Sequence, residues 1–308
     1  MPAELELRLV GAGGERVDFR RTVASHGVAD LPPLELDPDA RWLQVTLRLP
    51  GGRPRTVRVE EGRPGRATVT PFGRAPSRRQ SDAILAAVAH VLRLDEDLSA
   101  FYTIAMNDPE LGWAADGAGR MIRSPTVFED VVKTICTTNC AWSATERMVG
   151  ALVEHLGEPA PTSPAEGPYG RTFPTPAAMA EADESFYREV MRAGYRGAYL
   201  RSLAASVTAG AVDLEELGHA SPDELPDDEV AARLLALPGV GPYAAAHIMM
   251  MLGRYSRLIL DSWTRPKYAR LNGGRAVSDA TIERRFRPYG PYAGLAFWLH
   301  LTRDWIED

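Results

Sequence analysis

The sequence predicts an α+β protein in which a small antiparallel β domain precedes a larger all-helical body. Residues 41–62 alternate polar and apolar side chains on both sides of Pro50-Gly51-Gly52, which is the pattern of a β-hairpin. Residues 73–81 are rich in Pro, Ser and Arg and are typical of a linker. Beyond them, apolar residues recur mostly at helical spacing. We therefore predict a β-rich domain over 1–78 and a helical body, in two lobes, over 79–308.

The elements follow in order along the chain. A further short strand is predicted over 66–72, and the first helix over 81–94, beginning at a Ser81 cap. Residues 125–157 form a long apolar helical region that is interrupted near Thr138-Asn139 and closed by Gly157. A Pro- and Gly-rich loop over 157–176 separates it from several short capped helices, and one or two helices over 279–305 end the chain.

The composition restricts the class of protein. No run of 18 apolar residues and no signal peptide is visible, so we expect a cytoplasmic protein without a membrane partner. Two cysteines, Cys136 and Cys140, are expected to be reduced core thiols, because zinc and iron–sulfur sites need about four ligands.

The charge is distributed unevenly. The net charge of −6 counts against a nucleic-acid binder. Between residues 254 and 287, however, nine basic residues stand against three acidic ones. Such a patch is either a phosphate-binding surface or an ordinary solvated one.

Residues 234–251, LLALPGVGPYAAAHIMMM, predict two helices joined by a tight turn, with the hairpin over 229–252. Gly239 and Gly241 permit positive φ and close backbone approach, and Pro242 suits the first turn of the second helix. The free N–H groups of that turn suit a phosphate. A purely structural αα-hairpin is the alternative.

Asp261 follows the apolar run YSRLIL. It is either the cap of the next helix or a partly desolvated carboxylate that stabilises a developing cation, and the two roles are compatible.

The hairpin and Asp261, together with residues 122–157, 193–207 and 287–299, resemble the helix-hairpin-helix (HhH-GPD) DNA glycosylase superfamily. The 8-oxoguanine and AlkA-type 3-methyladenine branches are most similar, and the resemblance covers about residues 80–300. It implies a monomeric, nucleoid-associated enzyme that acts on double-stranded DNA containing a damaged base, with Asp261 as the catalytic residue. It also implies a structural K⁺ or Na⁺ at the hairpin, on the backbone carbonyls of Leu235, Leu237 and Val240, with no iron–sulfur cluster and no other required cofactor.

The resemblance also assigns residues to DNA and base binding. The DNA contacts it implies are Asn139, Gly239, Gly241, Arg265, Lys267 and Arg270, although Asn139 is equally readable as a turn residue. The base-pocket residues are Tyr243, His247, Trp263, Phe297 and Leu301. This pocket is more aromatic than that of the 8-oxoguanine branch, and aromatic faces suit cationic alkylated purines.

Tyr243 decides the expected chemistry. The 8-oxoguanine branch carries a Schiff-base lysine at this position, and a phenol cannot form a Schiff base. We therefore expect a monofunctional glycosylase in which Asp261 assists water attack. The alternatives are a bifunctional glycosylase/lyase for oxidised purines that uses another lysine, and a non-catalytic DNA-binding protein.

Overall fold

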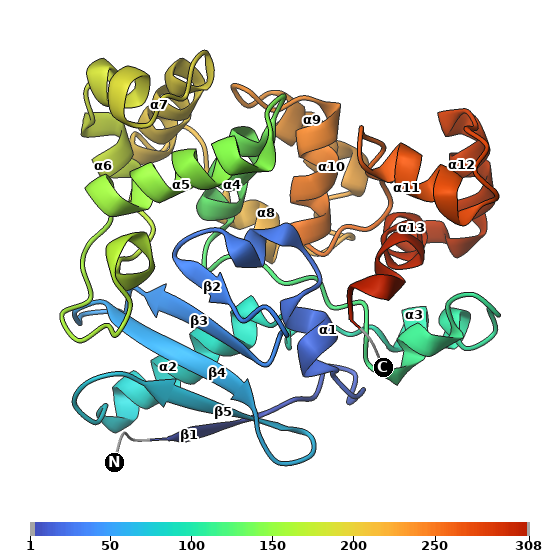
Figure 1. The fold of residues 1–308 in the computed structure, drawn as a ribbon, viewed down its shortest axis with the longest axis horizontal. Helices are drawn as coiled ribbons and strands as arrows, with labels where there is room; N and C mark the ends of the chain where they lie inside the picture. Colours follow the sequence, from blue (N-terminus) through green and yellow to red (C-terminus); the bar gives the residue numbers. More distant parts are fainter. Residues whose placement is uncertain (1–3, 307–308) are drawn as a thin grey trace.

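The computed structural model describes residues 4–306, and its N-terminal part is a five-stranded antiparallel sheet (Figure 1). The strand order is β1-β5-β4-β3-β2, with bounds Leu5–Arg8, Arg66–Pro71, Arg55–Glu61, Trp42–Leu47 and Leu34–Leu36. The predicted hairpin is confirmed, since β3 and β4 pair from Leu47↔Arg55 to Trp42↔Glu60. The predicted strand over 66–72 is confirmed as β5.

Short helical segments lie between the first strands and after the last. Helix α1 (Phe19–Val23) and the 3₁₀ turn η1 (Gly27–Asp30) connect β1 to β2. Helix α2 (Arg78–Val91) begins three residues before the predicted start, because Ser77 rather than Ser81 is the cap. Ser77 and Gln80 form a reciprocal capping box, which satisfies two otherwise free N–H groups.

The remainder is helical, and the α+β class is therefore confirmed. Its elements are α3 (Ser99–Ala105), η2 (Gly112–Asp116), α4 (Val127–Thr137), α5 (Trp142–Leu156), η3 (Gly167–Gly170), α6 (Pro176–Glu181), η4 (Phe186–Val190), α7 (Arg196–Thr208), α8 (Glu215–His219), α9 (Asp227–Leu235), α10 (Pro242–Met251), α11 (Thr264–Leu271), α12 (Asp279–Phe286), η5 (Arg287–Tyr292), α13 (Ala293–Thr302) and η6 (Arg303–Trp305). The break predicted near Thr138-Asn139 is the gap between α4 and α5.

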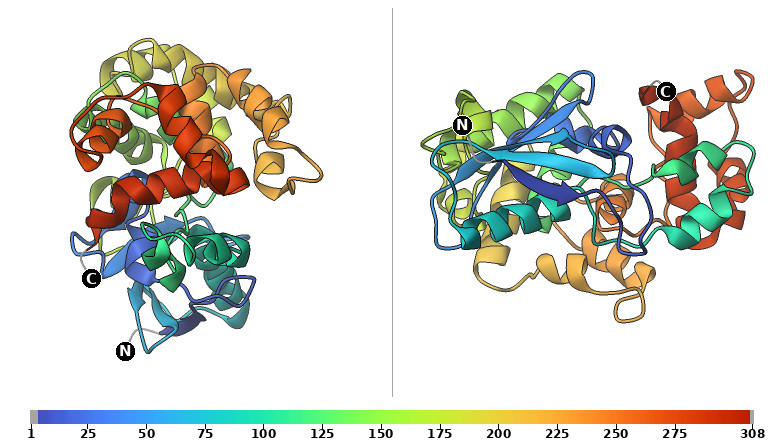
Figure 2. Two further views of the ribbon diagram at one scale, coloured as in Figure 1. Left: turned by 90° about the vertical axis from the view of Figure 1, so that its right-hand side faces the viewer. Right: turned by 90° about the horizontal axis from the view of Figure 1, so that it is seen from below.

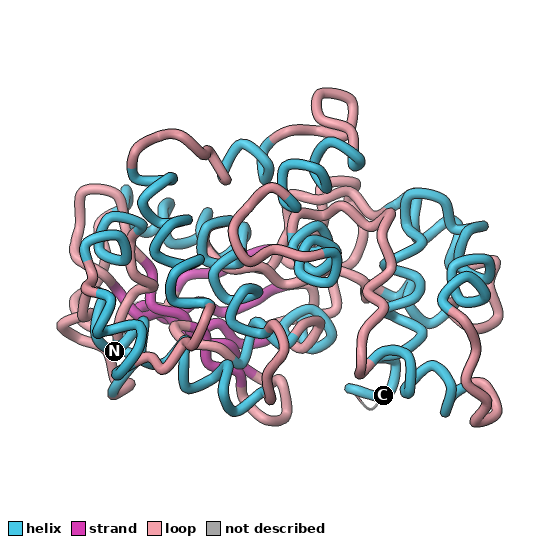
Figure 3. The backbone as a smooth tube through the Cα atoms, turned by 90° about the horizontal axis from the view of Figure 1, so that it is seen from above, coloured by secondary structure: helices cyan, strands magenta, loops and turns pink. Residues whose placement is uncertain are grey.

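Two clusters of buried residues form the core. The first joins the sheet and α2, through Ile84 and Val88, to helices from α4 to α10. The second joins α3 and η2 to α11, α12 and α13, so residues 98–121 pack with the C-terminal helices (Figure 2). In Figure 3 the strands lie together in one part of the molecule, and helices and loops form the rest. The second cluster is therefore discontinuous in sequence, and the domain boundary at 78/79 stays a prediction.

Helix α10 contributes to both clusters. Its residues from Ala244 to Met251 are all buried, as expected for a helix that is apolar on every side. None of the helices within residues 4–306 combines the length and apolar character that a bilayer span requires.

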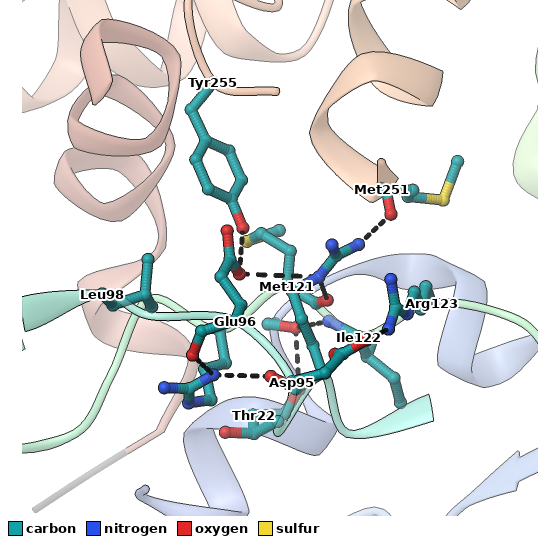
Figure 4. A network of polar contacts seen from close by, with 12 residues as sticks. Thr22, Asp95, Glu96, Leu98, Met121, Ile122, Arg123, Met251 and Tyr255 are labelled. Carbon is teal, nitrogen blue, oxygen red and sulfur yellow. Dashed lines mark hydrogen bonds and ion pairs between the residues drawn. The ribbon is translucent and has the colours of Figure 1, made fainter. Parts of the chain in front are cut away.

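A buried polar network holds the end of α10 (Figure 4). The Arg93 guanidinium donates to the carbonyls of Met121 and Met251, and it lies 3.8 Å from the Glu96 carboxylate. Glu96 also accepts the hydroxyl of Tyr255 at 2.8 Å. The segment that follows α2 is thereby tied to the chain that leaves α10.

Candidate active site

The turn between α9 and α10 has the conformation that its glycines predict. Gly239 has φ 81°, and a Cβ there would lie 2.9 Å from the Tyr199 ring. Gly241 is the extended N-cap of α10 and accepts the first helical hydrogen bond from Ala245 at 2.9 Å. Since Pro242 has no N–H, the free donors of the first turn are those of Tyr243 and Ala244.

This turn lines an open groove of about 980 Å³. Gly239, Gly241 and Tyr243 line it, as does the segment after α4. Asn139 is in that segment, with φ 48°, and its amide donates to the Tyr195 hydroxyl at 3.1 Å. The groove therefore brings Asn139 and the hairpin to one surface.

A second cavity of about 370 Å³, rich in aromatic side chains, adjoins the groove. Its walls come from η1, α4, α5, α10, α13 and η6. Five residues line both spaces, namely Thr137, Trp142, Tyr243, Asp261 and Trp263. Asp261 and Tyr243 thus lie where the groove meets the cavity.

The two oxygens of Asp261 have different partners. Oδ1 accepts the backbone N–H groups of Trp263 at 2.8 Å and Thr264 at 2.6 Å, at the start of α11. Oδ2 lies 3.9 Å from Nε2 of His247. Asp261 therefore binds N–H groups at the start of α11 and also lines the cavity, while its catalytic role stays a prediction.

The Asp261 carboxyl is a strong acid in this environment. Burial by itself raises its pKa, but the His247 imidazole, whose Nε2 lies 3.9 Å from Oδ2, and the backbone N–H groups of Thr264 and Trp263 outweigh burial. Together they lower the pKa to about 2. At neutral pH the cavity therefore contains a fixed negative charge.

Two histidines lie side by side behind the carboxylate. His247 on α10 is 8% exposed, and its Nδ1 lies 3.1 Å from Nε2 of His26. Nδ1 of His26 accepts the backbone N–H of Val28 at 3.2 Å. Burial and then the neighbouring His247 lower the pKa of His26 to about 3, which keeps His26 neutral.

Tyr243 contacts the same group of side chains. Its ring meets His247 edge-on with centroids 4.6 Å apart, and its hydroxyl lies 3.3 Å from Oγ1 of Thr137. Burial raises the pKa of the phenol; the hydrogen bond with Thr137 lowers it, and the Asp261 charge raises it further. Tyr243 therefore stays a neutral phenol at physiological pH.

Two predicted pocket residues lie elsewhere. Phe297 and Leu301 are fully buried in the second core cluster, where Phe297 packs on Tyr268 and Phe286. The prediction that they line the pocket is wrong, because they lie on the side of α13 that packs into the second core cluster and not on the side that lines the cavity. The other side of α13 presents Trp298, and η6 adds Trp305.

Other lining residues were not predicted at all. His26 belongs to the segment before η1, and Trp142 is the first residue of α5. Trp298 and Trp305 look like core residues in the sequence, although both line the cavity. Trp142 was predictable, because it closely follows the helix break at Asn139. His26 is far from the hairpin and Asp261 in the sequence, and no local pattern connects it with them.

The predicted phosphate-binding cations have different surroundings. Arg265 lines the groove but makes two hydrogen bonds to Asp279, and Lys267 is paired with Asp304. Arg270 is exposed on α11. Among the nine basic residues between 254 and 287, five are ion-paired: Arg254, Arg257, Arg265, Lys267 and Arg285. The basic patch is therefore partly neutralised.

The carbonyls proposed for a cation lie at the hairpin turn. The Leu237 carbonyl accepts the N–H of Val240 at 3.2 Å, which leaves one of its two lone pairs free for an ion. Neutral carbonyl oxygens, as at Leu235, Leu237 and Val240, are suitable K⁺ ligands. Within residues 4–306, no three His, Cys, Asp or Glu side chains gather as a metal site.

Solved DNA glycosylases share this architecture. The 3-methyladenine DNA glycosylase of Archaeoglobus fulgidus matches with a TM-score of 0.72 and 18% identity, over 99% of this chain and 100% of that one. MBOgg1, in complex with a low affinity DNA ligand, matches with a TM-score of 0.72 and 19% identity, over 99% of this chain and 96% of that one. The chain has the fold of these DNA glycosylases.

The 8-oxoguanine glycosylase/lyase of Clostridium acetobutylicum has the same fold, with a TM-score of 0.62 and 20% identity over 90% of this chain and 93% of that one. No protein-family model matches the sequence, and no curated protein matches it significantly. The resemblance predicted from the sequence is thus confirmed at the level of the glycosylase fold.

Proposed function

We propose that this protein is a monofunctional base-excision DNA glycosylase that removes an alkylated base from double-stranded DNA. The observation that carries the proposal is the position of Asp261, where the groove along the hairpin meets the aromatic cavity. DNA would lie along the groove and the damaged base would turn into the cavity. Its sugar would then lie at the carboxylate.

The reaction needs a negative charge at this point. Turning a base out of the stack costs a few kcal/mol, which contacts inside the cavity must offset. Breaking the N-glycosidic bond then builds positive charge on the sugar. With a pKa of about 2, Asp261 is ionised throughout the physiological range and stabilises that charge.

The cavity suits a flat, cationic base. Its volume of about 370 Å³ is within the usual range for small-molecule sites, roughly 300–1,000 Å³. Trp142, Tyr243, Trp263, Trp298 and Trp305 supply aromatic faces that attract cations. Alkylation at a ring nitrogen gives a purine a positive charge, so an alkylated purine fits this chemistry better than a neutral oxidised one.

The lysines argue for base removal without strand cleavage. The sequence contains two, Lys133 and Lys267. Lys133 lines the cavity, but its ammonium is buried against Glu129 at 2.7 Å and donates to the Leu31 carbonyl. Lys267 is paired with Asp304. Neither amine is a free nucleophile, and Tyr243 cannot replace one.

DNA would be held mainly by the backbone of the hairpin. The first-turn N–H groups after Gly241 suit a phosphate, and a K⁺ or Na⁺ on the neighbouring carbonyls would add positive charge to the turn. Asn139, which lines the same groove, would enter the duplex. Arg270, which is exposed, would add a phosphate contact, whereas the ion pairs with Asp279 and Asp304 reduce the contributions of Arg265 and Lys267.

Replacing Asp261 by Asn tests the proposal, because Asn keeps the helix cap but removes the charge. We expect base release from alkylated duplexes to fall at least about 100-fold, with DNA affinity and melting temperature nearly unchanged. Duplexes with deaminated bases or 8-oxoguanine complete the substrate panel.

Two results would overturn this assignment. A covalent adduct trapped by borohydride with the wild-type protein would indicate a glycosylase/lyase, and Lys133→Arg would then test the cavity amine. Salt-sensitive DNA binding without release of any base would indicate a non-catalytic binding protein.

A further inference from the structure

We propose that His26 and His247 form a hydrogen-bonded two-imidazole relay that makes His247 a fixed hydrogen-bond donor beside Asp261, where it positions the attacking water. The inference rests on the proposed function and deepens it. His247 acts here as a positioning residue, and His26 acts through it.

One backbone N–H group determines which nitrogen of each imidazole carries the proton. The N–H of Val28 is a donor and points at Nδ1 of His26, so that nitrogen is unprotonated. A neutral imidazole has one N–H, which must then be on Nε2. Nε2 of His26 therefore donates to Nδ1 of His247, 3.1 Å away. By the same argument, the N–H of His247 is on its own Nε2.

The surroundings hold both rings in place and keep His26 neutral. Burial and the neighbouring His247 lower the pKa of His26 to about 3. His26 stacks on Trp298, with ring centroids 5.6 Å apart, and His247 is held between Tyr243 and the same Trp298. The other charged groups that line this cavity are Asp30, Lys133 and Asp261.

The donor thus fixed has no protein partner. Nε2 of His247 is buried and has no hydrogen-bond partner among residues 4–306. Of the buried, unpartnered side-chain nitrogen and oxygen atoms in these residues, it is the one whose residue lines the cavity. It lies 3.9 Å from Oδ2 of Asp261, which is longer than a hydrogen bond. An oxygen atom at about 2.8 Å from both would see them at an angle of roughly 90°, which suits a water molecule.

Such a water would be oriented for attack. It accepts from His247, donates one proton to Asp261 and keeps a lone pair for the sugar. The water oxygen forms the new bond to C1′ as the N-glycosidic bond breaks, and the bonding electron pair leaves with the base. The water proton passes to the carboxylate and, because that group is a strong acid, on to the base or solvent.

Two substitutions of His26 separate the relay from packing. In His26→Asn, the shorter amide still accepts the Val28 N–H but no longer reaches His247. In His26→Gln, the longer amide keeps a donor at the position of Nε2. His155→Asn, on the exposed end of α5, is the matched control.

We expect His26→Asn to lower the single-turnover rate of base release about tenfold without changing DNA affinity. His26→Gln should restore most of that rate, and His155→Asn should leave it unchanged. Long-range ¹H–¹⁵N NMR spectra should show His247 protonated on Nε2 in the wild type and in His26→Gln, and as a mixture of tautomers in His26→Asn.

A wild-type His247 protonated on Nδ1 would overturn the relay, as would a His26→Asn protein as fast as the wild type. Failure of the proposed function gives a different result, since the wild type would then release no base. The tautomers read by NMR would still decide whether the relay exists.

Discussion

At the scale of single residues, the side chains around Asp261 divide between two environments. Trp263 is 38% exposed and lines both the groove and the cavity, whereas Phe297 is fully buried on the far side of α13. Both are aromatic residues that were predicted to line the base pocket. Because the two side chains differ in exposure, we expect Trp263 to contribute to base binding and Phe297 to the stability of the fold.

Trp263→Ala should weaken base release about tenfold, through a higher KM for alkylated DNA, because it removes one aromatic face. Its effect on the free energy of unfolding should be below about 1 kcal/mol, since the ring is partly exposed. Phe297→Leu should destabilise the fold by about 1–3 kcal/mol and leave the rate unchanged. Urea unfolding and steady-state kinetics measure both, and a reversed pattern would contradict the cavity assignment.

His26 gives a pH dependence to the stability. Its pKa is about 3 in the folded protein, while an unfolded chain has about 6.5. The unfolded state therefore binds more protons between these values, and stability falls as the pH falls through that window. The loss should reach about 2 kcal/mol at pH 5.

His26→Asn should remove this part of the pH dependence. Urea unfolding of the wild type and the variant at pH 7.5 and pH 5 measures it. His90, with a pKa lowered to about 4 by burial and by Arg123, contributes equally to both proteins. Equal losses in the two proteins would mean that His26 already titrates normally in the fold.

At the scale of elements, the hairpin depends on one glycine more than on the other. Gly239 has φ 81° and its α-hydrogen faces the Tyr199 ring, whereas Gly241 is extended and a Cβ there would meet open space. The two glycines look equivalent in the sequence.

Gly239→Ala should therefore destabilise the protein by about 1–3 kcal/mol and weaken DNA binding several-fold, because the turn must shift. Gly241→Ala is the matched control for stability and should leave the melting temperature nearly unchanged, because a Cβ there meets no other protein atom. Thermal melting and fluorescence anisotropy with duplex DNA measure both. Similar losses in the two variants would show that the backbone path of the turn is unimportant.

At the scale of the whole molecule, the site is assembled from segments far apart in the chain. The segment before η1 supplies His26, α10 supplies Tyr243 and His247, and the chain before α11 supplies Asp261. The indole N–H of Trp298 donates to the Ser25 carbonyl at 2.8 Å, which ties α13 to that first segment. The Arg93 network fixes the far end of α10 (Figure 4).

Arg93→Leu should destabilise the protein by about 3–5 kcal/mol, because it leaves Glu96 and two carbonyls buried without their partner. Base release should decline with it, since α10 carries three of the residues that line the cavity. Arg16→Ala, which breaks an exposed ion pair with Asp116, should change stability by less than about 0.5 kcal/mol. Chemical unfolding compares the two, and an Arg93→Leu protein as stable as Arg16→Ala would contradict the network's importance.

Much of the architecture follows from the sequence, because local patterns encode it. Alternation around Pro50-Gly51-Gly52 determined the β3–β4 hairpin, and the apolar residues flanking Gly239 and Gly241 determined the helical hairpin. Asp261 was noted from the apolar run before it, and the resemblance to the glycosylase superfamily gave Asp261 and Tyr243 their expected roles. These features depend on neighbours within a few residues.

Only the tertiary structure decided which aromatic side chains face the cavity. Helix α13 is apolar on nearly all sides, so periodicity could not distinguish Trp298, which lines the cavity, from Phe297, which does not. The contact of His26 with His247 joins residues 221 positions apart, and no local pattern encodes it. The sequence by itself determined the hairpin and its carboxylate; packing between distant segments determined the cavity that the carboxylate serves.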